Sequence, residues 1–369
     1  HLVTHGMLLA ASVAAVMSLG GYLLVEPVFA RLGADAETLP LIGQYMRTWY
    51  VGAVFMVLPM LGNGILISSG DSKAASMFMI VGTVLNTILD PIMIFGWLGM
   101  PAMGIRGAAL ATVMAQAVST VWLIWLLTRK HRLLVWRGWY GSDVATSLRR
   151  IMRFAIPSIL SMILMPISAT VITRILSGFG DEAVAATGAA GRIEMFAFMV
   201  PMALGISLMP FVSQNFGAGR MDRVRQARRL STWFAVLYGG LIAVAFFVAA
   251  PALAALFTKD PRVADTLISY IRIVSFGYGL MEVHRYSGFF LTGMHRPINA
   301  TLLNVIRVLV FLIPLSWLGA RFWGIVGVFG GRLATDVVVG CLGILWVARV
   351  LARQKAAAAG GGHGSGAVR

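Results

Sequence analysis

Long apolar segments follow one another along most of the chain, separated by short polar or basic connections. A membrane-spanning helix needs about 20 predominantly apolar residues. Segments of that length predict helices over residues 7–30, 41–68, 74–98, 104–128, 151–177, 183–213, 231–257, 264–292, 298–320 and 324–350. An outer-membrane barrel would instead show short segments of alternating polarity. The pattern therefore predicts an all-α polytopic membrane protein with about ten transmembrane helices.

The composition excludes a soluble globular domain. Hydrophobic residues make up 59% of the 369 residues and charged residues only 12%, and the mean hydropathy is +0.84. Soluble domains carry about 25% charged residues. The net charge of +16 could suggest a nucleic-acid partner, but no soluble nucleic-acid-binding module surrounds the basic residues. We therefore expect no nucleic-acid partner.

The basic residues are concentrated in alternate connections. Segment 129–153 carries seven Arg or Lys residues and segment 214–230 carries five, whereas the connection 177–183 carries Asp181 and Glu182 without a cation. Cytoplasmic loops of membrane proteins are enriched in Arg and Lys. We therefore expect a multi-pass protein of the cytoplasmic (inner) membrane whose basic loops contact anionic lipids and whose two ends are both cytoplasmic.

An internal repeat organises the chain. The sequence Trp-Leu-Gly at 97–99, followed by Gly-Ile-x-Gly at 104–107, recurs at 317–319 and 324–327 with the same internal spacing. Predicted helices one to four thus match helices seven to ten, in the same orientation across the membrane. Such a repeat predicts two pseudo-symmetric lobes related by an axis along the membrane normal.

The repeat also predicts the domain organisation. The N-terminal lobe is expected over residues 1–128, a cytoplasmic linker between the lobes over 129–150, and the C-terminal lobe over 151–355. The tail 356–369 is rich in Ala and Gly and is expected to be disordered. Predicted helices five and six have no partners in the first half. We therefore expect two further helices to precede residue 1, which makes the chain N-terminally truncated.

Asp90 is a carboxylate inside the apolar segment 74–98. Asn86 lies four residues before it, so both side chains occupy one face of the predicted helix, where they can share an ion or a proton. Asp90 lies about 24 Å along the helix from residue 74 at 1.5 Å per residue, in the outer half of the membrane. Intramembrane acids are costly and usually functional. The alternative is that the two side chains only bond neighbouring helices. Pro91 predicts a bend beside this site.

The second half of the chain offers less distinctive polar residues. The predicted helix 264–292 carries Glu282, His284 and Arg285, and the helix 183–213 carries Arg192 and Glu194. These five residues form a possible second polar site. The alternative is that Glu282 with Arg285, and Arg192 with Glu194, are neutralising pairs that stabilise the lobe. His284 would then be a structural hydrogen-bond donor rather than a titrating group.

Several motifs resemble the multidrug and toxic compound extrusion (MATE) family. They are Asn86-x3-Asp90-Pro91, Gly104-Ile105-x-Gly107-Ala108-Ala109, and Gln214-Asn215-Phe216-Gly217-Ala218-Gly219-Arg220. The resemblance covers nearly the whole chain, from the family's third helix to its twelfth. It implies two six-helix lobes that alternate between inward-open and outward-open states.

The resemblance also implies a function and a site. Family members expel organic cations or other drugs in exchange for protons or sodium, and in the N-terminal lobe the cation site uses the residues matched by Asn86 and Asp90. A threonine on the next helix, matched by Thr112, joins them, and an acid on the family's first helix completes the site. We expect no cofactor or metal beyond sodium at Asp90, and a monomeric protein.

Three classes of function are compatible with a polytopic helical protein. A cation-coupled multidrug antiporter agrees with the Asn-x3-Asp pattern. A lipid-linked oligosaccharide flippase of the same two-lobe plan should carry many cations for pyrophosphate, whereas the segments here are mostly apolar. A membrane-embedded enzyme should show metal-ligand or nucleophile spacing such as His-Glu-x-x-His or Gly-x-Ser-x-Gly, and the sequence contains neither. We therefore expect an antiporter and not an enzyme.

Overall fold

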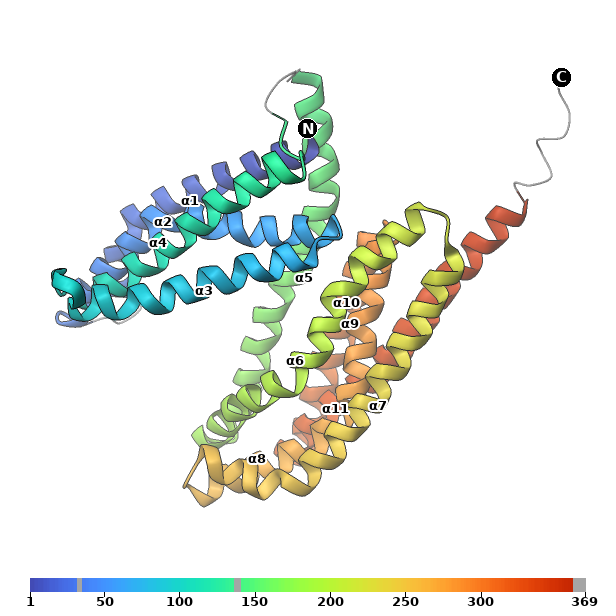
Figure 1. Ribbon diagram of the computed structural model, residues 1–369. Helices are drawn as coiled ribbons and strands as arrows, with labels where there is room; N and C mark the ends of the chain where they lie inside the picture. Colours follow the sequence, from blue (N-terminus) through green and yellow to red (C-terminus); the bar gives the residue numbers. More distant parts are fainter. Residues whose placement is uncertain (32–34, 136–140, 361–369) are drawn as a thin grey trace, which may run out of the picture. The chain divides into compact units, whose positions relative to one another are not determined.

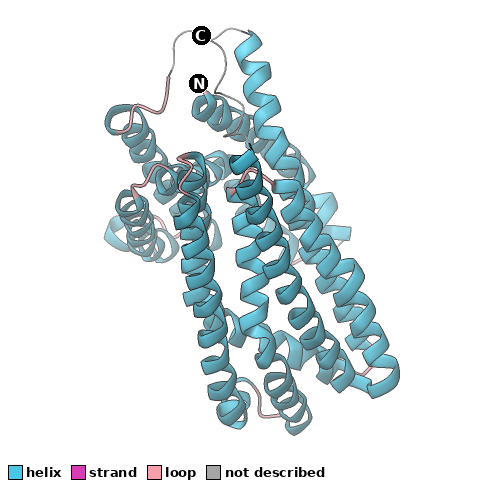
Figure 2. Cartoon of the chain, turned by 90° about the vertical axis from the view of Figure 1, so that its right-hand side faces the viewer, coloured by secondary structure: helices cyan, strands magenta, loops and turns pink. Residues whose placement is uncertain are grey.

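The computed structural model of the protein describes residues 1–31, 35–135 and 141–360. Every regular element in these ranges is a helix (Figure 2). The chain divides into two compact units, His1–Arg153 and Phe154–Arg369. The all-α fold predicted from the apolar segments is therefore confirmed.

The first unit is a group of four long helices. It contains α1 (Leu2–Arg31), α2 (Thr38–Ser68), α3 (Ser72–Phe95), the short 3-10 turn η1 (Trp97–Gly99), α4 (Gly104–Trp125), the π-helical turn η2 (Leu126–Lys130) and the first part of α5 (Gly141–Ser177). Helix α2 packs against both α1 and α4, and α4 packs against α3 (Figure 1). Their shared core includes Leu66, Phe78 and Leu123, all of which are buried.

The second unit contains the rest of α5 and the elements that follow it. These are α6 (Asp181–Gly217), α7 (Met221–Phe257), α8 (Pro261–Val274), the 3-10 turn η3 (Ser275–Gly277), α9 (Tyr278–Gly293), α10 (Pro297–Val305), the π-helical turn η4 (Ile306–Leu312) and α11 (Ile313–Gly360). Helix α9 packs against α6, α7 and α11. It therefore lies in the middle of this unit, where Tyr286 and Phe290 are buried.

The two units meet within α5, between Arg153 and Phe154, so part of the predicted linker is helical. Segment 141–150 of the predicted linker belongs to α5, and residues 136–140 lie outside the described residues. Helix α11 extends to Gly360, and the remainder of the predicted disordered tail, residues 361–369, also lies outside them.

Eight helical stretches of the described chain are long and apolar enough to cross a membrane. The predicted span 264–292 is not among them because the turn η3 divides it into the shorter helices α8 and α9. The last stretch, Pro297–Gln354, has 58 residues, whereas one crossing needs about 20. Gly324 interrupts it with a left-handed φ of 63°. The two predicted spans 298–320 and 324–350 are therefore the two sides of this break.

The chain reverses direction at Gly324, and glycines hold the two sides of the reversal in contact. A Cβ atom added at Gly327 would overlap the carbonyl of Gly319, and one added at Gly331 would overlap that of Leu315. These pairings bring residues before and after the break together as an antiparallel helical hairpin. The corresponding Gly104 of the first repeat also has a positive φ of 54°, and a Cβ at Gly107 would overlap the carbonyl of Met93. The repeated Gly-Ile-x-Gly sequence thus allows two helix backbones to come into close contact in both units.

Replacing Gly327 with alanine is expected to destabilise the hairpin. The added methyl group forces the two backbones apart, and overpacking of this kind costs about 1–3 kcal/mol. Gly330 provides a matched control because a Cβ there meets no atom within 4 Å, so Gly330→Ala should be neutral or stabilising by up to about 1 kcal/mol. Thermal unfolding of both variants in detergent tests this, and an equal midpoint for the two would contradict the close contact.

Asp71 connects the start of α3 to the start of the basic segment 129–153. Its carboxylate accepts a hydrogen bond of 2.9 Å from the backbone N–H of Ala74, which caps α3, and it lies 2.7 Å from Lys130 Nζ. His131 Nε2 lies 3.2 Å away. The Lys130 hydrogen bond, followed by that of Ala74, holds the pKa of Asp71 below its usual value. The cap therefore stays ionised and complements the helix N-terminus.

Candidate cation site and polar clusters in the two units

The three residues predicted for the first site come together between α3 and α4. Asn86 Nδ2 donates hydrogen bonds of 3.3 Å to Asp90 Oδ1 and 3.3 Å to Thr112 Oγ1. The Thr112 hydroxyl donates in turn to the carbonyl of Ala108 at 3.1 Å. All three side chains are half-buried. The arrangement places a carboxylate, an amide and a hydroxyl around one point of the first unit.

Small residues on α4 allow this approach. Ala111 and Ala115 of α4 are fully buried, and Gly107 lies directly against the backbone of Met93 on α3. Larger side chains at these positions would hold the helices apart and leave Thr112 too distant from Asn86. Gly107, the first residue of the Gly107-Ala108-Ala109 motif, thus allows the close approach of α3 and α4 beside this site.

The site offers oxygen ligands of the kind that hard cations prefer. The Asp90 carboxylate supplies the negative charge. The side-chain oxygens of Asn86 and Thr112 can add two further ligands, which gives part of a coordination shell for sodium. The same carboxylate can instead carry a proton. In the described part of the chain, no three His, Cys, Asp or Glu side chains gather closely enough to hold a metal ion. The site thus has one carboxylate beside two uncharged side chains.

Pro91 lies inside α3, which continues to Phe95. Because proline has no backbone N–H, the carbonyl of Thr87, one turn earlier, loses its helical hydrogen bond. The backbone beside Asp90 is therefore weaker than the rest of the helix. The bend at Pro91 remains a prediction.

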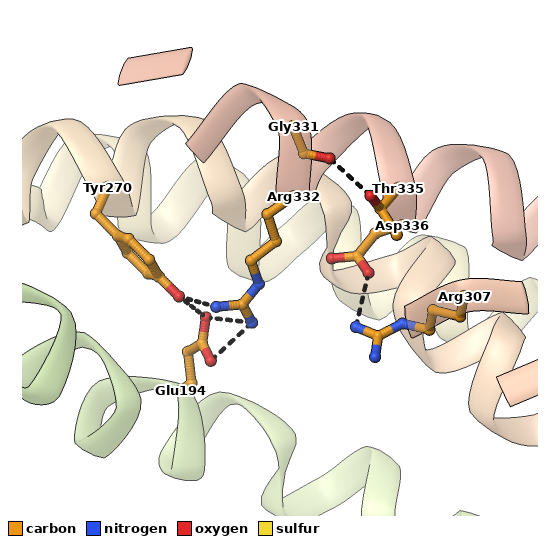
Figure 3. A network of polar contacts seen from close by, with 7 residues as sticks. All are labelled: Glu194, Tyr270, Arg307, Gly331, Arg332, Thr335 and Asp336. Atoms are coloured by element: carbon orange, nitrogen blue, oxygen red, sulfur yellow. Dashed lines mark hydrogen bonds and ion pairs between the residues drawn. The ribbon is translucent and has the colours of Figure 1, made fainter. Parts of the chain in front are cut away.

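A second polar cluster lies inside the other unit, where Glu194 of α6 faces Arg332 of α11 (Figure 3). The Glu194 carboxylate lies 2.9 Å from Arg332 Nη2 and accepts hydrogen bonds from the hydroxyls of Tyr270, at 2.7 Å, and Tyr278, at 3.2 Å. Arg332 also donates to the Tyr270 hydroxyl. Helices α6, α8, α9 and α11 each contribute one of these four side chains.

The pairing of Glu194 with Arg192 considered from the sequence is wrong. Glu194 bonds with Arg332 instead, and Arg192 is exposed. Residues two apart on a helix do not face each other, so the two side chains point in different directions from α6.

Asp336 was not identified from the sequence as a site residue. It lies four residues after Arg332 on α11, is 0% exposed, and its Oδ1 accepts a hydrogen bond of 3.1 Å from Arg307 (Figure 3). Arg307 is in turn only 14% exposed. An i,i+4 pair of opposite charges inside an apolar segment, Arg332 with Asp336, was the available signal for this cluster.

Glu282 and Arg285 form the i,i+3 ion pair that their spacing allows. Glu282 is 2% exposed, and its Oε1 lies 3.2 Å from Arg285 Nη1. The Arg285 guanidinium also lies over the Phe198 ring, 5.3 Å from its centroid. His284, between them in sequence, is buried. These contacts agree with the neutralising-pair alternative, and a second transport site at these residues remains a prediction.

The chain is similar to a known protein family and to several curated proteins. The MatE family model matches residues 1–92 and 157–318. A protein of Shewanella oneidensis named FAD transporter is 35% identical over 334 residues, which cover 90% of this chain and 74% of that protein. The multidrug export protein MepA of Staphylococcus saprophyticus is 24% identical over 87% of this chain and 70% of its own length.

Among solved structures, the Vibrio cholerae MATE transporter VcmN in its bent form superimposes with a TM-score of 0.87. It is 28% identical, and the match covers 96% of this chain and 79% of VcmN. A MATE structure described as the bent conformation gives a TM-score of 0.88 at 24% identity, which supports the fold alone.

Proposed function

Since this chain belongs to the MatE family of membrane transporters, we propose that it is a cation-coupled antiporter that expels small organic molecules by alternating access. Its relatives are named as transporters rather than enzymes. The observation that carries the coupling proposal is the hydrogen-bonded set of Asn86, Asp90 and Thr112.

The proposed mechanism turns on the charge of Asp90. An ionised carboxylate at membrane depth is costly unless a cation or polar groups accompany it. Binding of a proton or sodium removes that cost, so the helix packing preferred by the loaded site differs from that preferred by the empty site. A ligand shifts a conformational equilibrium only by such a difference in affinity. Substrate and cation then favour opposite states, which produces exchange.

Multidrug export is the substrate class that we favour, because MepA and the probable multidrug resistance protein YoeA are among the relatives. An organic cation would be complementary in charge to Asp90, the acid of the first site. The Shewanella relative, at 35% identity, favours a second candidate substrate, flavin adenine dinucleotide (FAD). That substrate carries a pyrophosphate and would need cations, whereas Arg285, whose side chain is 29% exposed, is paired with Glu282.

We further propose that the protein works as a monomer in the cytoplasmic membrane, in contact with anionic lipids. The Arg-rich segments 129–153 and 214–230 would then face the cytoplasm, in agreement with the positive-inside rule.

Transport by the purified protein in sealed vesicles tests the proposal. A proton gradient and a sodium gradient should be imposed separately, with ethidium or FAD as the transported molecule. One pH unit corresponds to about 1.4 kcal/mol per coupled proton, which supports a roughly tenfold concentration ratio of substrate. We expect one of the two gradients to drive this accumulation in vesicles containing protein and not in empty vesicles. Transport that is indifferent to both gradients would contradict cation coupling.

A further inference from the structure

An open cavity lies at the end of the second unit where α5 stops at Ser177 and the α11 hairpin turns at Gly324. Its volume is about 510 Å³. The cavity walls include Arg174, Ile175, Phe179, Trp317, Ala320 and Arg321. None of the lining residues belongs to the Asn86 and Asp90 site or to the buried charge clusters.

Two helix faces form the walls of this cavity. Positions 171, 174 and 175 share one face of α5, and positions 317, 320 and 321 share one face of α11. This spacing places the Arg174 guanidinium on the α5 wall and the Arg321 guanidinium on the α11 wall. Gly178 follows directly after the end of α5. Apolar side chains such as Ile175 and Ala320 supply the remaining lining. A ligand here would therefore meet two positive charges beside a hydrocarbon surface.

Both guanidiniums remain available to a ligand. Arg174 and Arg321 are exposed, and neither forms an ion pair with a carboxylate in the part of the chain that the structure describes. Arg321 lies over the Trp317 ring, 6.0 Å from its centroid. Glu182, an acid at this end of the unit, pairs with Arg262 at 3.5 Å. Guanidinium groups in this setting match phosphate oxygens in charge and geometry.

The surroundings indicate a membrane interface. Trp317, Phe322 and Trp323 are 52%, 67% and 72% exposed and lie at or near the hairpin turn. Aromatic side chains of this kind gather at the level of lipid headgroups, and arginines extend to the same level. The connection 177–183 at this end lacks cations, which assigns it to the outer side by the positive-inside rule.

We propose that this cavity binds the phosphate of an anionic phospholipid of the outer leaflet, with Arg174 and Arg321 on either side of the headgroup. The glycerol and the start of an acyl chain lie along the apolar wall that Ile175 and Ala320 provide. Trp317 covers the guanidinium of Arg321 and restricts its motion. The proposal does not depend on the transported substrate.

Native mass spectrometry of the purified transporter titrated with phosphatidylglycerol tests the proposal. Phosphatidylcholine, which has the same phosphate but no net charge, and inorganic phosphate serve as comparison ligands. A basic side chain near an anionic lipid surface is worth roughly fivefold in affinity, so Arg174→Gln with Arg321→Gln should weaken phosphatidylglycerol binding roughly thirtyfold. Lys259→Gln with Arg262→Gln, two cations of the same end outside the cavity, should leave it unchanged.

Three results would overturn the proposal. Phosphatidylglycerol could bind the Arg174 and Arg321 double variant as tightly as it binds the unmodified protein. Phosphatidylcholine could bind with equal affinity. Inorganic phosphate could bind as tightly as the lipid, which would make the ligand a soluble phosphate compound. Should the glutamine variant fail to fold, Arg174→Lys with Arg321→Lys keeps both charges and must retain the preference for phosphatidylglycerol over phosphatidylcholine.

Discussion

Asp90→Asn is expected to abolish gradient-driven efflux while leaving the protein folded. Asparagine keeps the size of the side chain and an oxygen that can accept the Asn86 hydrogen bond, which is 3.3 Å long in the unmodified protein. It cannot bind a proton in the relevant pH range and carries no charge for sodium. The roughly tenfold accumulation supported by one pH unit should therefore fall to the level of empty vesicles.

Asp71→Asn provides the matched control for this experiment. Asp71 lies on the same helix, as the cap of α3 outside the site, and asparagine caps helices as well as aspartate does. This variant should transport normally. Thr112→Val, which removes the hydroxyl that accepts from Asn86, should give an intermediate loss. Full gradient-driven transport by Asp90→Asn would refute the assignment of Asp90 as the coupling residue.

Arg307→Met is expected to destabilise the second unit by about 3–5 kcal/mol, because it leaves Asp336 as an unpaired buried charge. Asp336 is 0% exposed and its ion pair with Arg307 is 3.1 Å long. The double variant Arg307→Met with Asp336→Leu removes both charges and should recover most of the loss, since apolar replacement of a buried pair is often neutral. Unfolding midpoints of the single and double variants in detergent give the interaction energy.

The exposed pair Arg225 and Asp222 is the control for this cycle. The distance between these side chains is 2.6 Å, but Asp222 is 96% exposed. Exposed pairs contribute about 0–1 kcal/mol, so Arg225→Met should have little effect on the unfolding midpoint. If Arg307→Met were equally harmless, Asp336 would not depend on Arg307 for its charge compensation.

The sequence predicted most of what depends on one helix at a time. Apolar segment length predicted the long helices, although η3 divides the predicted span 264–292 into α8 and α9. The recurrence of Gly-Ile-x-Gly marked the two close backbone contacts at Gly107 and Gly327. The i,i+4 spacing of Asn86 and Asp90 and the i,i+3 spacing of Glu282 and Arg285 correspond to contacts in the structure. Such spacings fix neighbours on a helix face regardless of how the helices pack.

Contacts between helices were harder to predict. Arg332 reaches Glu194 across 138 positions of sequence, and Arg307 reaches Asp336 only because the turn η4 packs against α11. The sequence pattern predicts the apolar face of each helix, but it does not predict which of several buried charged side chains form pairs between helices. Thr112 was found only through family resemblance, because a hydroxyl in an apolar helix carries no pattern of its own.

Cation release on substrate binding tests the central claim most directly. The heat of ethidium or FAD binding to the purified protein should be measured in buffers of different ionisation enthalpy, and in parallel with and without sodium. For the unmodified protein we predict that substrate binding releases protons, or that the affinity for substrate falls as the sodium concentration rises. For Asp90→Asn, which should remain folded, we predict neither effect. An equal cation exchange in both proteins would contradict the account.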